Sequence, residues 1–275
     1  MTSVLALTLL LAGPAPAKAI KWEKGFDQAM ELARKQDKPV LVGFWTEWSG
    51  LSRRLDRTTW VEPLVTSKAQ SFIAVKVDAE GNRRELEVAR TYDVHNVPTI
   101  LFLSPRGRQL MRVDGVEGPG RFPHTMDKAL ETARRIGSWE EALERDPNDA
   151  AALYALGVHF WNQKCYRDSY DLLARAAVHD ARRPPHERRR TRLLLAILEN
   201  AQRKYAEAES MIKEALSLDP KAPDQPSLLF VLGSTYVSWG RHAEGVQTMQ
   251  VIVREHSQSP MAQKARETLF ILERK

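Results

Sequence analysis

Apolar residues in the first half of the chain switch between helical and strand spacing. A first helix is marked by apolar residues three or four positions apart: Phe26, Ala29, Met30 and Ala33. Pro39 stops this helix after about Gln36. The continuous apolar run from Val40 to Phe44 then predicts a strand that is buried on both faces. A helix followed at once by a buried strand indicates an α/β domain.

Six further segments continue this alternation up to residue 137. We expect a helix from Ser49 to about Ser67, broken at Pro63, and a strand over Ser71–Asp78. A turn at Pro105-Arg106-Gly107 predicts a hairpin. The remaining elements are a helix, the two hairpin strands and a last helix: Arg83–Tyr92, Thr99–Leu103, Gln109–Asp114 and Phe122–Arg135. The order α-β-α-β-α-β-β-α predicts one α/β domain over residues 20–137.

The second half of the chain repeats a helical pattern. Ser138-Trp139-Glu140-Glu141 has the form of a capping box and predicts a helix that starts there and ends at Asp146-Pro147. Three later units each carry a leucine followed by a small residue: Leu156-Gly157, Leu195-Ala196 and Leu232-Gly233. The small residues are 39 and 37 positions apart, and residues 260–273 predict a closing helix.

These units resemble tetratricopeptide repeats, most clearly at Lys204–Ala208 and Leu218-Asp219-Pro220. The spacing exceeds the family's period of about 34 residues, which fits short insertions at Arg182–His186 and Ala222–Pro226. The resemblance implies an all-α domain over residues 138–275. It also implies a peptide groove lined by the first helix of each repeat, with these matching residues: Tyr154, Trp161, Asn200, Phe230 and Ser234. Trp161 and Phe230 fit a core position between repeats equally well.

Length and charge limit the functional classes. At 275 residues the chain has room for about two domains. Its net charge of +6 is spread along the chain, whereas a nucleic-acid-binding domain carries a strongly basic face. The one dense basic run is Arg182–Arg190, and an exposed connection between helices explains it better than contact with an acidic partner or lipid.

The first 19 residues predict a secretory signal peptide. Val4 to Ala12 forms a short apolar region, and Ala17-Lys18-Ala19 is a small-residue cleavage site. The apolar run is shorter than the roughly 20 residues of a transmembrane helix. We therefore expect cleavage after Ala19 and a periplasmic or secreted protein. Oxidising compartments favour disulfides, yet the single cysteine, Cys165, can form none within the chain, and we expect it to be half buried.

The candidate chemistry lies at Trp45-Thr46-Glu47-Trp48-Ser49-Gly50-Leu51-Ser52, directly after the first predicted strand. This segment resembles the active site of the thioredoxin family, in which a buried strand leads into W-C-G-P-C at the start of a helix. Ser49 and Ser52 stand where that family has its attacking and resolving cysteines. A serine hydroxyl cannot cycle between dithiol and disulfide, because the reaction requires two sulfur atoms.

A second motif strengthens the resemblance. Tyr92-Asp93-Val94-His95-Asn96-Val97-Pro98-Thr99 resembles the thioredoxin segment that carries a cis-proline beside the redox pair, so the resemblance implies a cis Val97–Pro98 bond. In that family the backbone before this proline pairs with an extended substrate peptide. The implied peptide-binding residues are Trp48, Gly50, Leu51, Val97, Pro98 and Thr99.

Other departures from the family bear on function. Gly43 stands where many thioredoxins have a buried aspartate that assists proton transfer, and glycine cannot do this. A serine nucleophile would need a base and an orienting group; His95 and Asp93 are the nearest in sequence, but nothing in their spacing supports that set. Arg53, Arg54 and Arg57 follow the motif on an expected exposed helix face. No metal-ligand spacing or nucleotide-binding motif occurs, so we expect no cofactor and no metal.

The sequence therefore predicts a thioredoxin-like α/β domain followed by an all-α tetratricopeptide domain. We expect an exported protein that binds a protein or an extended peptide and performs no catalysis. We expect no nucleic acid and no small-molecule cofactor as partner, and membrane contact is not indicated. The alternative is a thiol-disulfide oxidoreductase of the thioredoxin family in which serines replace the cysteines. A serine-dependent enzyme is a third hypothesis.

Overall fold

The computed structural model describes residues 19–272. The predicted signal peptide therefore lies almost wholly outside the described residues. Contacts divide the chain into two compact units, one that ends at Gly137 and one that begins at Ser138. No helix within residues 19–272 is both long and apolar enough to cross a membrane.

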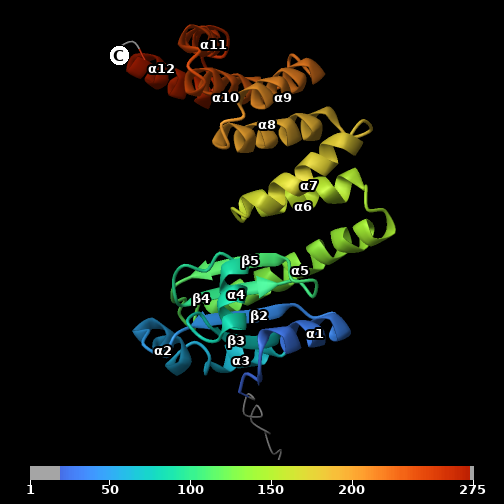
Figure 1. Ribbon diagram of the computed structural model, residues 1–275, viewed down its shortest axis with the longest axis vertical. Helices are drawn as coiled ribbons and strands as arrows, with labels where there is room; N and C mark the ends of the chain where they lie inside the picture. The colour runs from blue at the N-terminus through green and yellow to red at the C-terminus, as the bar shows by residue number, and fades with distance from the viewer. Residues whose placement is uncertain (1–18, 273–275) are drawn as a thin grey trace, which may run out of the picture. The chain divides into compact units, whose positions relative to one another are not determined.

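The first unit contains a five-stranded sheet with the strand order β1-β3-β2-β4-β5. Figure 1 shows the strands and helices of this unit. The strands are β1 (Trp22–Glu23), β2 (Val40–Trp45), β3 (Ile73–Asp78), β4 (Thr99–Leu103) and β5 (Gln109–Asp114). The strands β1, β3 and β2 are parallel, and β4 and β5 are antiparallel to their neighbours. The helices are α1 (Phe26–Gln36), α2 (Gly50–Arg57), α3 (Pro63–Ala69), α4 (Arg83–Thr91) and α5 (Phe122–Arg145).

Apolar residues on both faces of the sheet form its core. Val40, Val42 and Phe44 of β2 pack on one face against residues of α1, β3, α4 and β4. On the other face, the ring of Phe102 lies 6.0 Å from that of Phe122 in α5. This confirms the strand expected over Val40–Phe44 as a central strand, because β2 pairs with β3 on one side and with β4 on the other.

Several predicted boundaries of the first unit were wrong. β1 was missed because two residues are too few to show an alternation. The break expected at Pro63 in the helix over Ser49–Ser67 is confirmed, since Pro63 starts α3 at a position that proline favours, but α2 already ends at Arg57. The helix expected over Phe122–Arg135 runs on to Arg145, and no helix begins at Ser138. Gly137 is the only weak helix former at the expected break, and a helix interior tolerates one glycine at a cost of about 1 kcal/mol.

Paired helices form the second unit: α6 (Ala150–Asn162), α7 (Tyr166–His179), α8 (Pro185–Ala201), α9 (Tyr205–Leu218), α10 (Gln225–Ser238), α11 (His242–Glu255) and α12 (Pro260–Leu272). The small residues of the repeats let the two helices of a pair approach closely. A Cβ atom on Gly157 would lie 2.7 Å from the Leu173 side chain, and one on Gly233 would lie 2.9 Å from Met249. Cys165, at the start of α7, is half buried as expected.

The basic run at Arg182–Arg190 is not simply an exposed connection. Helix α8 begins at Pro185, and the side chain of Arg189 is only 1% exposed. Arg189 donates hydrogen bonds to Asp224 and to the backbone carbonyls of Ala215 and Asp219. The position of Arg189 on α8 directs its side chain toward α9, so acceptor groups within the second unit satisfy its charge.

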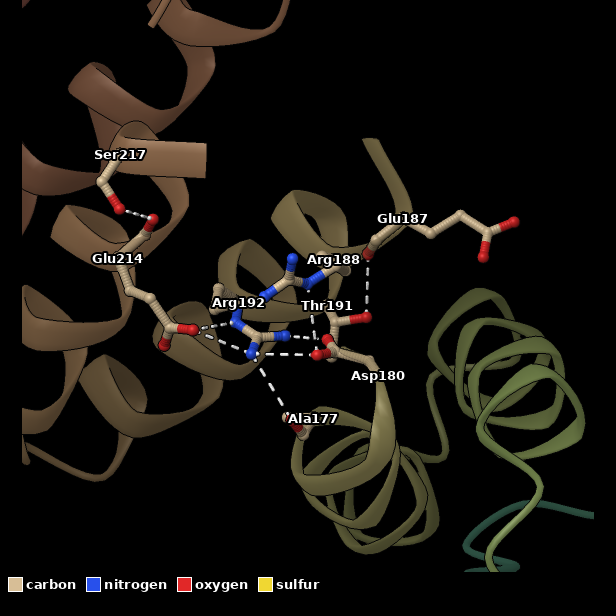
Figure 2. A network of polar contacts seen from close by, with 8 residues as sticks. All are labelled: Ala177, Asp180, Glu187, Arg188, Thr191, Arg192, Glu214 and Ser217. Carbon is tan, nitrogen blue, oxygen red and sulfur yellow. Dashed lines mark hydrogen bonds and ion pairs between the residues drawn. The ribbon is translucent and has the colours of Figure 1, made fainter. Parts of the chain in front are cut away.

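A second buried arginine on α8 joins the neighbouring helices (Figure 2). Arg192 pairs with Asp180, which follows α7, and with Glu214 of α9; Asp180 also accepts from Arg188. The side chains of Arg192 and Asp180 are each only 7% exposed. Taken with Arg189, these contacts tie the C-terminal ends of α7 and α9 to α8.

Candidate functional site

Ser49 and Ser52 occupy the start of α2, directly after the central strand. Ser49 is the N-cap residue, and its Oγ accepts a hydrogen bond from the Ser52 N–H at 3.2 Å. This is the bond that a serine cap makes to an otherwise unpaired helix N–H. Both serines are buried. Ser49 therefore has a structural role that needs no chemistry of its hydroxyl.

Beneath Ser52 lies a recess of about 10 Å³, close to the smallest volume that holds one water molecule. The residues that line it come from three strands, α2 and the segment after it: Gly43, Phe44, Trp45, Ser52, Leu55, Asp56, Trp60, Lys76, Pro98 and Ile100. The Ser52 Oγ is buried and makes no hydrogen bond within the described residues. One wall of the recess therefore carries a hydroxyl group that has no hydrogen-bond partner among the described residues.

Lys76 and Asp56 form an ion pair at this recess. Lys76 lies on β3, and its ammonium is 5.1 Å from the centre of the Trp22 ring. Asp56 lies four residues after Ser52, so one turn of α2 places both on the same side. The sequence did not predict the Lys76–Asp56 ion pair. The four-residue spacing that places Asp56 on the same side of the helix as Ser52 was visible in the sequence.

The second motif meets the first at the same recess, because Pro98 and Ser52 both line it. The Val97–Pro98 bond is cis, as expected. The segment is held by two contacts to its flanks: Gly115 N–H donates to the Pro98 carbonyl at 2.8 Å, and Thr99 Oγ1 donates to the Asn96 carbonyl at 2.7 Å. The Thr99 side chain is thus buried and engaged inside the unit.

The backbone of Val97 is unpaired. Neither its N–H nor its carbonyl makes a hydrogen bond in the part of the chain that the structure describes, and the residue is only half buried. It precedes β4, whose backbone is paired on both sides with β2 and β5. A donor and an acceptor therefore remain available one residue before Pro98.

Three predicted contact residues of the first motif are exposed. Trp48 is 64% exposed and Leu51 is 50% exposed, and Gly50 also faces solvent. The Trp48 indole N–H donates to Glu80 at 2.9 Å, which fixes the ring although most of it is accessible. An ordered and exposed aromatic side chain is typical of a binding surface.

The structure does not assemble the serine-dependent set. His95 is 75% exposed and pairs with Asp93 at 2.9 Å. No hydrogen bond joins His95 to Ser49 among residues 19–272, and Ser49 Oγ contacts the Ser52 N–H instead. A serine nucleophile needs a base within hydrogen-bond reach, so this hypothesis has no geometric support. The same residues contain no group of three His, Cys, Asp or Glu side chains placed to hold a metal ion.

The predicted groove residues lie on the first helix of each repeat. Tyr154 and Trp161 of α6 are half buried against a cluster that includes Leu173 and Leu194, and burial raises the pKa of the Tyr154 hydroxyl. Phe230 of α10 packs against the cluster around Met249 and Ile252. Asn200 of α8 is half buried with an Oδ1 that accepts no hydrogen bond within the described residues, and Ser234 of α10 is also half buried.

Two family models match the chain. The model for thioredoxin-like domains matches residues 21–105, and that for tetratricopeptide repeats matches residues 136–186 and 193–260. The chain carries a thioredoxin-like domain followed by tetratricopeptide repeats. The degenerate Ser49-Gly50-Leu51-Ser52 motif therefore lies within a thioredoxin-like domain, as its resemblance to that family indicates.

Two curated relatives each match less than a third of this chain. The thiol:disulfide interchange protein DsbD of Vibrio vulnificus is 26% identical over 81 residues, which cover 29% of this chain and 14% of that protein. The thioredoxin of Mycobacterium tuberculosis is 30% identical over 82 residues, which cover 30% of this chain and 66% of that protein. The match thus spans about a seventh of DsbD.

Among solved structures, the thioredoxin-like domain is similar to the DsbH oxidoreductase, with a TM-score of 0.41 and 20% identity over 46% of this chain and 94% of that one. A thioredoxin from Thermus thermophilus gives a TM-score of 0.40 and 21% identity, over 44% of this chain and 94% of that one.

Proposed function

We propose that this chain is an exported protein that binds protein partners through its thioredoxin-like site and performs no thiol-disulfide exchange. Its only cysteine, Cys165, lies in the tetratricopeptide unit, and the two motif positions are serine. Exchange requires a thiolate that attacks and a second sulfur that releases the mixed disulfide. Export rests on the predicted signal sequence that ends at Ala19.

The observation that carries this proposal is the unpaired backbone of Val97, which precedes Pro98 at the recess that Ser52 also lines. The exposed ring of Trp48 belongs to the same motif as Ser52. An extended peptide can form main-chain hydrogen bonds with a free N–H and carbonyl, as in strand addition, while side-chain contacts add specificity. Trp48 and Leu51 supply accessible apolar area for such contacts. A peptide can bind to this surface without contacting a thiol, so serine at positions 49 and 52 is compatible with binding.

The tetratricopeptide repeats supply a second docking surface in this proposal. Repeats of this kind stack into extended concave surfaces that proteins use for binding. The half-buried side chains of Tyr154, Trp161 and Phe230 lie on the first helices of the repeats, where a partner segment would meet them. With these two binding surfaces the protein would act as a scaffold or a chaperone-like factor.

A second candidate function is thiol-disulfide exchange by a form with cysteines at positions 49 and 52. The recess beneath Ser52, with its Lys76–Asp56 pair, favours this candidate, because a charged pair beside a resolving thiol could take part in proton transfer. The names of the similar proteins, a thioredoxin and a thiol:disulfide interchange protein, point the same way.

Insulin reduction by dithiothreitol separates the two candidates. We expect the unaltered chain to add nothing to the rate with dithiothreitol alone, because Ser49 and Ser52 cannot carry electrons. A Ser49→Cys/Ser52→Cys form that accelerates the reaction would show that the surrounding scaffold still supports exchange. Acceleration by the unaltered chain would contradict the proposal, provided that a Cys165→Ser form accelerates it equally.

Binding is tested with reduced, carboxymethylated α-lactalbumin, an unfolded chain with no free thiol. We expect Trp48→Ala to weaken its binding by roughly fivefold or more, since an exposed aromatic anchor contributes about 1 kcal/mol or more. Leu64→Ala is the control, because Leu64 is an exposed apolar residue of α3 that belongs to neither proposed surface. Isothermal titration calorimetry measures both. Equal affinities of the unaltered chain and Trp48→Ala would contradict binding at this site.

A further inference from the structure

Helix α2 presents three arginines to solvent next to the proposed peptide site. Arg53, Arg54 and Arg57 are all exposed, whereas Ser52 and Leu55 of the same helix are buried. The only acidic residue of α2 is Asp56, and its carboxylate is paired with Lys76. The exposed face of this eight-residue helix therefore carries positive charge without a compensating acid.

None of these three arginines pairs with a carboxylate within residues 19–272. Arg54 and Arg57 form no ion pair within residues 19–272, whereas Arg84 pairs with Asp27, and Arg112 pairs with Asp114. Arg53 Nη1 donates to the Glu47 carbonyl at 2.6 Å, which holds its charge at the start of the helix. No acidic residue lies in the first turn, so the positive end of the helix dipole adds to this field.

Exposed apolar side chains lie next to the arginines of α2. Leu51 precedes Arg54 by three residues, so the two share one stripe of the helix surface. Trp48 lies just before the helix and is held by Glu80, and Glu47 is exposed beside it. Glu47 and Glu80 thus supply negative charge around Trp48, and the three arginines supply positive charge on α2.

We propose that the segment bound at this site is an extended peptide with an apolar residue over Trp48 and Leu51, flanked by aspartate or glutamate residues over Arg54 and Arg57. This inference rests on the proposed function, because it names the class of peptide for the same surface. Carboxylates on the peptide would pair with arginines that have no partner in the free chain. Lysine or arginine at those positions would face like charges, and such charge patterns set specificity more than affinity.

Three short capped peptides test the charge preference. They share an apolar core of Leu-Val-Phe and differ in the residues that flank it, which are aspartate, asparagine or lysine. Binding is followed by the shift of the Trp48 indole resonance in ¹H–¹⁵N NMR spectra, assigned with Trp48→Phe. We expect the aspartate peptide to bind roughly tenfold more tightly than the asparagine peptide at about 0.05 M salt, and the lysine peptide to bind most weakly. Near 0.5 M salt the affinities of the three peptides should converge, because salt screens the interaction between the peptide charges and the arginines.

Paired charge variants show whether α2 is the source of the preference. Arg54→Gln/Arg57→Gln should abolish the advantage of the aspartate peptide over the asparagine peptide. Lys128→Gln/Arg134→Gln is the matched control, since it removes the same charge from exposed residues of α5 and should preserve the advantage.

The outcomes distinguish this inference from the proposed function. Equal binding of the aspartate and asparagine peptides would overturn the inference and leave peptide binding intact. A loss of the advantage in both double variants would also overturn it, because net charge rather than α2 would then be responsible. Binding of none of the peptides would overturn the inference together with the peptide site on which it rests.

Discussion

Gly43 lies in the strand beneath the two serines, at a place where a larger side chain fits. A Cβ atom built on it would lie 3.9 Å from Trp60 and 4.0 Å from Lys76 and Trp22, which are ordinary contact distances. Glycine is therefore not required by close packing at this position. Its lack of a side chain contributes instead to the recess beside Ser52.

We expect Gly43→Ala to raise the free energy of unfolding by about 0.5–1 kcal/mol, because alanine restricts the unfolded chain and a methyl group fits the space. Gly157→Ala is the contrasting variant. Its Cβ would lie 2.7 Å from Leu173, so we expect a loss of about 1–3 kcal/mol from overpacking. Urea unfolding measures both. A destabilised Gly43→Ala form would show that this strand position is more crowded than its contacts indicate.

Individual residues were predictable where one local pattern determines them. The helix start at Ser49 and the burial of Val40 to Phe44 follow from the motif and from the apolar run. The burial of Arg189 was not predictable, because its partners Asp219 and Asp224 are distant in sequence and arginine is mostly exposed. The unpaired backbone of Val97 depends on sheet pairing, which side-chain patterns do not specify.

Helix α8 organises the charges of the second unit. Arg189 and Arg192 are three residues apart, yet Arg189 contacts the C-terminal end of α9, and Arg192 also reaches the end of α7. Arginine near a helix C-terminus pairs with free carbonyls and with the negative end of the helix dipole. This one helix therefore links consecutive repeats through charge as well as through apolar contact.

We expect Arg192→Met to lower the free energy of unfolding by about 3–5 kcal/mol, because it leaves the buried carboxylate of Asp180 with fewer partners. Arg190→Met is the matched control, since Arg190 is exposed on the same helix and its replacement should change stability by less than about 0.5 kcal/mol. Guanidinium chloride unfolding, followed by circular dichroism, measures both. Similar losses in the two variants would show that the Asp180 contact contributes little.

At the level of elements, the long periodic segments were predicted well and their ends were not. β3 and β4 begin and end close to the expected residues, because each has a clear apolar pattern. The end of α2 at Arg57 was missed because the residues between Arg57 and Pro63 contain no glycine or proline. The continuity of α5 was missed because a capping-box sequence at Ser138 matches a helix start even inside a helix.

The molecule contains two units, and helix α5 crosses the boundary between them. The units divide at Gly137 and Ser138, whereas α5 runs from Phe122 to Arg145. Residues 138–145 therefore belong to the second unit by their contacts, although they continue a helix of the first. Trp139 and Leu143 in this stretch are half buried, and Glu140 is only 3% exposed.

We expect a fragment of residues 138–275 to fold, and a fragment of residues 146–275 to unfold at a temperature lower by roughly 5 °C. The shorter fragment lacks the half-buried side chains of Trp139 and Leu143, whose burial is worth about 1–2 kcal/mol. Thermal unfolding followed by circular dichroism gives both midpoints. Trp139→Ala in the longer fragment should reproduce part of the difference. Equal unfolding temperatures of the two fragments would show that residues 138–145 do not stabilise the second unit.

The cap formed by Ser49 has a consequence for cysteine at the same position. A serine Oγ is a strong acceptor for a helix N–H, whereas a thiol sulfur is a weak one. A Ser49→Cys form would exchange this acceptor for a weak one and lose up to about 1 kcal/mol at the start of α2. The single change would also supply only one of the two sulfurs that exchange needs. Cysteine at position 49 alone is therefore expected to weaken the start of α2 without supporting redox chemistry.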